Sequence, residues 1–300
     1  MKEIIRITAG LTISCFLAAM IMGAAFVITD KSKKQNEFNN TQATMLGLLG
    51  YGKENPAPEE LRLYPVYRYI VEEDGETCLG YMVPVKSSDH EAYEFLILDL
   101  EGRLISRFPL DISLKKAVED SERQKILKET LKTETAFAYQ DRIIVARLRD
   151  KRVAYLLPGE FTGFKTFIEV MLALDTRFDI IGLEIVKNEE DPGLGAEIEQ
   201  DYFKNQFKDK SFERLKNLAV VKKPLPEDYR QYLEDPDTLS AEELEKIRNQ
   251  YLDNDIYALT GATVSSRAVT NGVKNMAKRF AYRINILDEV IAGHQIPAVI

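Results

Sequence analysis

The sequence is poor in the residues that bind metals. Its 300 residues include two cysteines, Cys15 and Cys78, and two histidines, His90 and His294. An iron–sulfur cluster needs about four thiolates, and c-type haem needs a Cys-x-x-Cys-His segment. A structural zinc site needs about four Cys or His ligands. None of these centres can be assembled here, so we expect no metal site, and any redox role would use an organic cofactor.

Two other absences narrow the function further. No Gly-x-Gly-x-x-Gly segment follows a predicted strand, so the chain has no nicotinamide site of that kind. Positive charge is also in deficit, because the formal net charge is -8. An acidic protein is repelled by nucleic acid phosphates, and we expect no nucleic acid partner. With 45% hydrophobic and 29% charged residues, the composition favours a packed globular core.

The most distinctive apolar feature is an uncharged run of 22 residues, Ile7 to Ile28. At about 1.5 Å per residue, a helix of this length crosses the roughly 30 Å hydrocarbon core of a bilayer. A cleaved signal peptide is the alternative, but its apolar segment usually spans only about 7–15 residues. Lipoprotein processing at Cys15 is disfavoured because the preceding Leu11–Ser14 lacks a small residue at the required position. Basic residues flank the run on both sides, so the positive-inside rule does not decide its orientation.

The remaining chain divides by composition. Residues 31–60 are polar, contain Pro56 and Pro58, and predict a linker. We expect an anchor at 1–30, a β-rich module with a surface helix at 61–134, a second domain at 135–292 and a tail at 293–300.

Alternating apolar segments predict four antiparallel hairpins or strand pairs. Within three of these pairs, the turn between the two strands is predicted at Glu73–Gly75, Glu101–Gly102 and Asp175–Asp179. The similar pattern of the segments 93–108 and 166–186 suggests an internal duplication, although hairpins resemble one another in general. The predicted strands are 64–71, 78–85, 93–100, 103–108, 142–148, 153–157, 166–174 and 180–186.

Helical spacing of apolar residues predicts helices at 113–132, 198–207, near 240–251 and at 264–291. Ser240 and Glu243 have the spacing of a capping box, which marks a helix start. The class is therefore α+β: an antiparallel sheet with packed helices, preceded by one transmembrane helix.

The segment Thr260-Gly-Ala-Thr-Val-Ser-Ser266 has the strongest chemical signal. It predicts a tight turn that enters the last helix. Gly261 permits close approach of a ligand to the backbone. The hydroxyls of Thr263, Ser265 and Ser266 lie where free helical amides and the helix dipole favour a phosphate. Ordinary capping of the helix by these hydroxyls is the alternative.

This segment closely resembles the Ser/Thr-Gly-Ala-Thr motif of the FMN-binding domain family. That family includes RnfG of Rnf-type electron transport complexes and NqrC of sodium-pumping NADH:quinone reductases. A second match precedes it: Glu190-Asp-Pro-Gly-Leu-Gly195 resembles the family's Glu-Thr-Pro-Gly-Leu-Gly segment. The resemblance covers roughly residues 135–285, which makes 135–292 the expected FMN-binding domain.

The resemblance implies a covalent flavin. Thr263 would carry FMN through a phosphoester that a separate flavin transferase installs, and no residue would be catalytic. Other expected partners are the membrane subunits of an Rnf/Nqr-type complex that translocates ions. The flavin domain would face the extracytoplasmic side of the inner (cytoplasmic) membrane. The expected cofactor-binding residues are Thr260, Gly261, Ala262, Thr263, Val264, Ser265, Ser266, Gly193, Leu194 and Gly195.

One position departs from the family pattern. An acidic residue usually stands three positions before the first Thr or Ser of the motif, whereas this chain has Tyr257 there, with Asp253 and Asp255 nearby. The departure leaves one alternative open, and residues 35–134, which the resemblance does not cover, leave a second one open. The chain could be a membrane-anchored scaffold with the same fold and no flavin. It could also be a flavinylated electron carrier that acts outside an Rnf complex.

Overall fold

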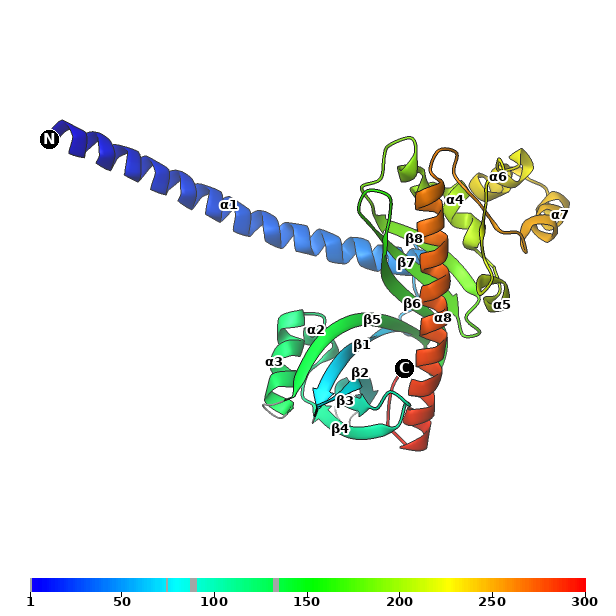
Figure 1. Cartoon of the computed structure of the whole chain (residues 1–300), viewed down its shortest axis with the longest axis horizontal. Helices are drawn as coiled ribbons and strands as arrows, with labels where there is room; N and C mark the ends of the chain where they lie inside the picture. The colour runs from blue at the N-terminus through cyan, green and yellow to red at the C-terminus, as the bar shows by residue number, and fades with distance from the viewer. Residues whose placement is uncertain (1, 74, 87–90, 132–134) are drawn as a thin grey trace. The chain divides into compact units, whose positions relative to one another are not determined.

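The computed structural model describes residues 2–73, 75–86, 91–131 and 135–300 (Figure 1). It contains one large sheet, one small sheet and several helices. The strands are β1 Leu61–Glu73, β2 Glu76–Lys86, β3 Glu91–Leu98, β4 Leu104–Leu110, β5 Ala136–Leu148, β6 Lys151–Thr162, β7 Phe167–Asp175, β8 Ile180–Lys187, β9 Val220–Val221 and β10 Ile256–Tyr257. The α-helices are α1 Lys2–Leu48, α2 Leu114–Ala117, α3 Asp120–Thr130, α4 Asp201–Lys204, α5 Phe212–Leu215, α6 Glu227–Glu234, α7 Ala241–Tyr251 and α8 Thr263–Gly293.

Helix α1 is the main element of the first of two compact units, Met1–Gly47. Within it, Lys2–Phe26 is long and apolar enough to cross a membrane. The helix continues to Leu48, so the expectation of an irregular linker at 31–60 is wrong for its first part. No proline interrupts residues 31–48, and the Lys33–Glu37 pair at i,i+4 supports the helical turn.

The second unit, Leu48–Ile300, is built on an eight-stranded antiparallel sheet with the order β4-β3-β2-β1-β5-β6-β7-β8. Each half is a meander of four consecutive strands, and the two meanders join where β1 pairs with β5 over most of their length. The expected modules 61–134 and 135–292 therefore contribute to one sheet. Their division at residue 134 stays a prediction, as does the internal duplication, although both meanders are followed by helices.

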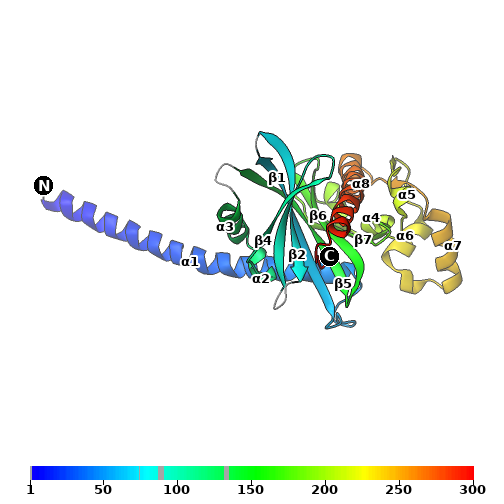
Figure 2. The same cartoon turned by 90° about the horizontal axis from the view of Figure 1, so that it is seen from below.

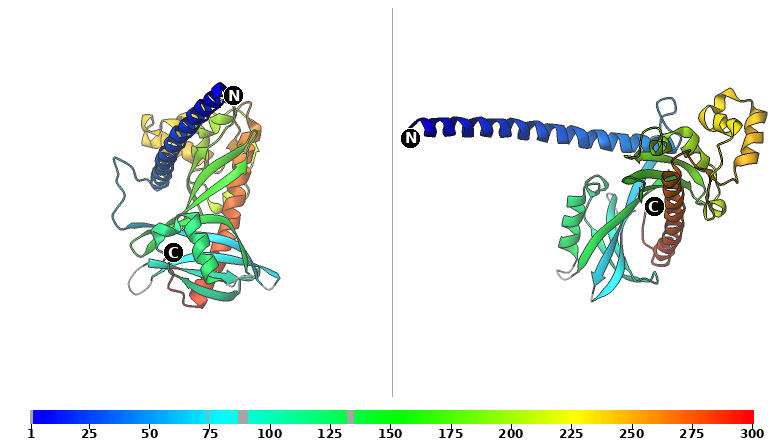
Figure 3. Two further views of the ribbon diagram at one scale, coloured as in Figure 1. Left: turned by 90° about the vertical axis from the view of Figure 1, so that its left-hand side faces the viewer. Right: turned by 45° about the horizontal axis from the view of Figure 1, so that its top comes forward.

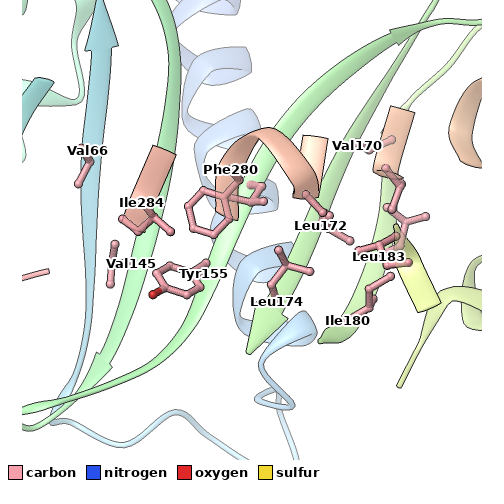
Figure 4. Close-up of a cluster of buried hydrophobic side chains, with 14 of the residues drawn as sticks. Val66, Val145, Tyr155, Val170, Leu172, Leu174, Ile180, Leu183, Phe280 and Ile284 are labelled. Atoms are coloured by element: carbon pink, nitrogen blue, oxygen red, sulfur yellow. The ribbon is translucent and has the colours of Figure 1, made fainter. Parts of the chain in front are cut away.

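The two faces of the sheet carry different cores because side chains alternate along a strand. On one face, Tyr64, Val66 and Tyr155 pack with α8 residues such as Phe280 and Ile284. Figure 4 shows Val66 and Tyr155 of the strands beside Phe280 and Ile284 of α8. On the opposite face, Tyr67 and its neighbours pack with α2 and α3. Views from below and from the side show α8 lying along the sheet (Figures 2 and 3).

The segment that follows α8 returns to the sheet. Val85 of β2 bridges Ala298, and the Lys86 amide donates to the Pro297 carbonyl at 2.9 Å. Arg147 donates to the carbonyl of Ile300 at 2.8 Å, and the Ile300 side chain is buried. The expected tail at 293–300 is thus packed against the strands, because its isoleucines remove apolar surface from water.

The predicted hairpins are confirmed, and glycine explains one turn and aspartate another. Gly102 turns between β3 and β4 with φ +85°. Asp175 accepts hydrogen bonds from the Arg177 and Asp179 amides at 2.8 and 2.9 Å, and these bonds close the β7–β8 turn. The turn predicted at Glu73–Gly75 includes Asp74, which lies outside the described residues, as does His90.

Two predicted helices are corrected. Residues 113–132 form two short helices, because the backbone is extended at Glu119, between Val118 and the first residue of α3. Lys132 lies outside the described residues. Residues 198–207 form separate helical turns, because the backbone is extended at Gln200. By contrast, the helices predicted near 240–251 and at 264–291 are confirmed as α7 and α8, and Ser240 and Glu243 form the capping box.

Candidate functional site

The candidate site lies at the start of α8, a helix of 31 residues that begins at Thr263. The residue before it, Ala262, has no side chain that can cap the helix. Within the described part of the chain, the amides of Thr263, Val264 and Ser265 have no hydrogen-bond acceptor. The helix dipole adds partial positive charge at the same end. This helix start can therefore bind an anion.

A tight turn presents this helix start. The Ala262 amide donates to the Leu259 carbonyl at 3.1 Å, and Gly261 has φ +77°. The Ser266 hydroxyl accepts a hydrogen bond from the Leu259 amide at 3.0 Å and donates one to the Ala262 carbonyl at 2.9 Å. Ser266 is fully buried, and its hydroxyl is used to fix the turn.

The second predicted motif contacts this turn. Gly193 has φ +72°, and Leu194 follows it with 45% of its surface exposed. A Cβ atom on Gly261 would lie 2.8 Å from Leu194 Cδ2. Leu194 thus packs directly over the one position in the turn that has no side chain. The structure brings the two motifs together although about 65 residues separate them in the sequence.

Glu190 connects three segments at the site, a role that its position in the motif did not indicate. The residue is 5% exposed. Oε1 accepts hydrogen bonds from the amides of Phe164 at 2.8 Å and Lys165 at 3.1 Å. Oε2 accepts one from the Ser265 hydroxyl on the first turn of α8. The turn between β6 and β7, the loop after β8 and the helix start are held together by this one side chain.

Small residues surround the Glu190 carboxylate. A Cβ on Gly195 would lie 2.7 Å from Glu190 Oε2 and 2.9 Å from Ser265 Oγ. A Cβ on Gly163 would overlap Oε1. Gly195, which was predicted to bind the cofactor, is buried and makes room for this carboxylate. The signal that could have indicated Glu190 is the pair of glycines Gly163 and Gly195, which leave room for its carboxylate.

The predicted site residues differ in their exposure. Thr260 and Gly261 are exposed, Thr263 is half-buried and Ala262 is buried. Val264 is 53% exposed, so the first turn of α8 presents an apolar side chain to solvent. Phe164, whose amide binds Glu190, is 63% exposed and was not predicted. Each of the three segments that Glu190 joins thus carries an exposed apolar side chain: Phe164, Leu194 and Val264.

Tyr257, which stands where the family pattern has an acid, and the nearby Asp255 both have structural roles. The Tyr257 amide donates to Gln206 Oε1 at 2.7 Å, and its ring lies edge-on to Tyr229. Asp255 forms an ion pair with Arg214 and accepts a hydrogen bond from the Ala219 amide at 3.0 Å. Asp255 is therefore engaged in holding the strand that leads to the turn.

A buried lysine fixes the segment before that strand. Lys210 is 1% exposed, and its Nζ donates to the carbonyls of Leu252 and Asn254 at 2.6 and 2.7 Å. Burial lowers the pKa of this amine to about 8. Lys210 thereby anchors the chain between α7 and β10, just ahead of the Thr260–Ser266 segment.

Comparison with known proteins confirms the resemblance predicted from the two motifs. Residues 163–278 match the model of the FMN-binding domain family. The G subunit of the proton-translocating ferredoxin:NAD(+) oxidoreductase complex of Clostridium ljungdahlii is 31% identical over 134 residues. This alignment covers 45% of the present chain and 57% of that relative.

The G subunit of the Na(+)-translocating ferredoxin:NAD(+) oxidoreductase complex of Acetobacterium woodii is 30% identical over 115 residues, which is 38% of the present chain and 42% of that relative. The chain thus spans about half the length of these curated relatives. Among solved structures, NqrC of Shewanella oneidensis is 18% identical, with a TM-score of 0.33 and coverage of 48% of this chain and 57% of that one. The C subunit of the Na(+)-translocating NADH-quinone reductase of Parabacteroides distasonis is 20% identical, with a TM-score of 0.33 and coverage of 64% and 74%.

Proposed function

We propose that this chain, whose residues 163–278 match the FMN-binding domain family, is an electron-transfer flavoprotein subunit that carries FMN on Thr263 through a phosphoester. One observation carries the proposal. The half-buried Thr263 is the first residue of an uncapped helix, beside a glycine turn that Leu194 covers.

The residues present fit a flavin phosphate. The amides of Thr263, Val264 and Ser265, which have no acceptor among the described residues, would bind phosphate oxygens, and the helix dipole would stabilise their charge. The exposed side chains of Leu194, Val264 and Phe164 would contact an apolar ring. When bound, the flavin would accept and release one or two electrons. Glu190 would keep the three surrounding segments in place, and the covalent link at Thr263 would prevent loss of the group from an exposed position.

The same proposal places the chain at a membrane among other redox subunits. Lys2–Phe26 has the length and composition of a membrane span. The relatives at 30–31% identity are subunits of ion-translocating ferredoxin:NAD(+) oxidoreductase complexes. By analogy, partner membrane subunits would supply and remove the electrons. The flavin domain would lie on the extracytoplasmic side of the inner membrane, after a flavin transferase has acted on it.

The test is co-expression of the full chain with a flavin transferase. We expect flavin fluorescence in a denaturing gel and an intact mass increased by one FMN ester. A Thr263→Ala variant should lose both signals, whereas Thr260→Ala should retain them. If the Thr263→Ala protein still carries flavin, the attachment site is elsewhere. If the wild-type chain stays unmodified while a known family member is modified, the proposal fails.

A second candidate function follows from Tyr257. With Tyr257 in place of the usual acid and Asp255 engaged by Arg214, a transferase that requires an acid there would not modify the chain. The protein would then be a membrane-anchored scaffold.

A third candidate is a flavinylated carrier outside a complex. Co-purification separates it from the first: a member of a complex brings its membrane partners with it, and a carrier does not.

A further inference from the structure

The solvent-facing side of α8 carries a line of exposed residues that begins close to the candidate site. Its members follow one another at steps of three or four residues, so they lie on one side of the helix. At about 1.5 Å per residue, the line is about 22 Å long. We call it the α8 stripe, and its residues are Arg267, Asn271, Asn275, Lys278 and Tyr282, all of them exposed.

The charges on α8 have one sign over most of its length. Between Thr263 and Leu287 the helix contains no Asp or Glu. The basic residues in this stretch are Arg267, Lys274, Lys278, Arg279 and Arg283. Solvated helix faces commonly mix both signs, and the whole chain has a net charge of -8. The outer side of α8 therefore carries a local charge opposite to that of the protein, which attracts acidic surfaces.

Much of this charge is not used inside the protein. Arg283 Nη1 donates to Asp141 Oδ2 at 3.2 Å. By contrast, Arg267, Lys278 and Arg279 are exposed, and none of them pairs with an acid among the residues that the structure describes. Unpaired charges of this kind steer a partner of opposite sign toward the surface and fix its orientation.

One large aromatic side chain lies among these charges. Tyr282 is 67% exposed, one turn after Lys278 on the same side of the helix. Tyrosine and arginine are enriched where proteins bind each other, because both bury a large area against a partner. A typical interface of about 800 Å² per partner is roughly as long as the stripe. The combination of cations and an exposed ring indicates a protein partner.

The position of the stripe links this partner to the candidate site. Arg267 lies four residues after Thr263, which is about 6 Å along the helix axis. A protein that covers the stripe therefore also reaches the surroundings of Thr263.

We propose that the α8 stripe is the docking surface of an acidic electron-carrier protein, whose carboxylates pair with Arg267, Lys278 and Arg279. Tyr282 supplies the apolar contact. That the partner carries electrons rests on the proposed function, because docking here brings its redox centre near Thr263. One electron then passes between the two centres, so that one is oxidised and the other reduced. The docking itself requires only the stripe and is independent of flavin.

The test measures binding of the full chain, held in phosphatidylcholine nanodiscs, to the acidic carrier flavodoxin by biolayer interferometry. Empty nanodiscs are the blank. We expect flavodoxin to bind at low ionic strength and to dissociate as salt screens the charges. Lys278→Glu/Arg279→Glu should weaken this binding at least tenfold, and Tyr282→Ala at least threefold. The basic carrier cytochrome c should bind the double variant no more weakly than the wild type. Absence of flavodoxin binding would overturn the proposal.

A matched control reverses two charges elsewhere. Lys125→Glu/Lys128→Glu changes the net charge equally, on α3, which packs on the opposite face of the sheet. This variant should bind flavodoxin within twofold of the wild type. Equal loss in the two double variants would show general electrostatic attraction and refute a defined surface. Thermal unfolding midpoints equal to that of the wild type establish that both variants are folded.

Two further measurements separate this proposal from other outcomes. Thr263→Ala, which lacks the proposed attachment site, should bind flavodoxin as tightly as the wild type. If the wild-type chain carries no flavin but binds flavodoxin through the stripe, the proposed function fails and the docking surface stands. Lys278 should react equally with an amine-reactive reagent in phosphatidylcholine and phosphatidylglycerol nanodiscs. Its protection only in phosphatidylglycerol would assign the stripe to the lipid surface and overturn the proposal.

Discussion

The hydroxyl of Ser265 donates a hydrogen bond to the buried carboxylate of Glu190, and this bond joins the first turn of α8 to the loop after β8. The same carboxylate binds the amides of Phe164 and Lys165. A buried carboxylate that satisfies three donors is costly to remove, because each donor then lacks a partner. The geometry of the candidate site thus depends on a residue that is itself buried.

Removal of Glu190 tests this dependence. We expect Glu190→Ala to lower the free energy of unfolding by about 2–4 kcal/mol, because three donors, one of them a buried hydroxyl, lose their acceptor. Covalent flavin loading should fall at the same time, since the three segments are no longer joined. Chemical denaturation and in-gel fluorescence measure the two effects. The neighbouring Glu189→Ala is the matched control, because Glu189 is exposed. Equal loading of both variants would contradict the role of Glu190.

Two glycines with positive φ angles should respond differently to alanine. At Gly193 (φ +72°) an added methyl group meets no atom within 4 Å, so we expect only the backbone strain of about 1 kcal/mol. At Gly261 (φ +77°) the methyl group also meets Leu194, so Gly261→Ala should be more destabilising and should reduce flavin loading. Adding Leu194→Ala to Gly261→Ala should restore part of the stability. No difference between the two glycine variants in thermal unfolding would refute this contact.

Tyr257 should control the rate of flavinylation. If the transferase recognises an acid at this position, Tyr257→Asp should speed modification several-fold in a time course with purified transferase. Tyr257→Phe keeps the edge-on packing against Tyr229 and serves as the control, with an expected rate equal to the wild type. The backbone bonds to Gln206 do not depend on the side chain, so the strand should persist in both. An unchanged rate in Tyr257→Asp would show that the transferase does not recognise the acid.

Lys210 should make stability depend on pH. Its pKa falls from the ordinary 10.5 to about 8 in the fold, so the unfolded chain holds the extra proton between these values. Stability should therefore rise with pH between about 8 and 10, by at most about 1.4 kcal/mol per pH unit from this group. A neutral amine keeps two N–H groups, which suffice for the carbonyls of Leu252 and Asn254. Denaturation of wild type and Lys210→Met across this range should show the slope only in the wild type.

Arg123 should stabilise the packing of α2 and α3 on the first meander, β1 to β4. It is 4% exposed, donates to the carbonyls of Ala117 and Val118 at 2.7 and 2.9 Å, and lies 4.2 Å from the ring centre of Tyr67. We expect Arg123→Gln to lower the free energy of unfolding by about 2–4 kcal/mol, because a buried network loses its donor. The exposed Lys125→Gln should change it by less than about 0.5 kcal/mol. Similar losses in the two variants would argue against this network.

Local sequence predicted much of the fold because the interactions that form these elements join residues close together in the chain. Alternation along strands such as β7 and β8, the Asp175 turn between them and the capping box of α7 all depend on residues a few positions apart. Segments whose structure depends on distant packing were predicted less well. The predicted helix at 198–207 breaks into turns that bury Phe203 and Phe207 against the sheet. A core of this kind overrides local helix propensity.

The sequence by itself determined the antiparallel α+β class, the membrane-length apolar run and the two motifs that match the FMN-binding domain family, because each is written in contiguous residues. Only the tertiary structure decided that Leu194 covers Gly261 and that Glu190 joins three segments. Those relationships join residues that lie far apart in the chain. They arise when burial of apolar surface brings strands and helix together, which no local pattern records.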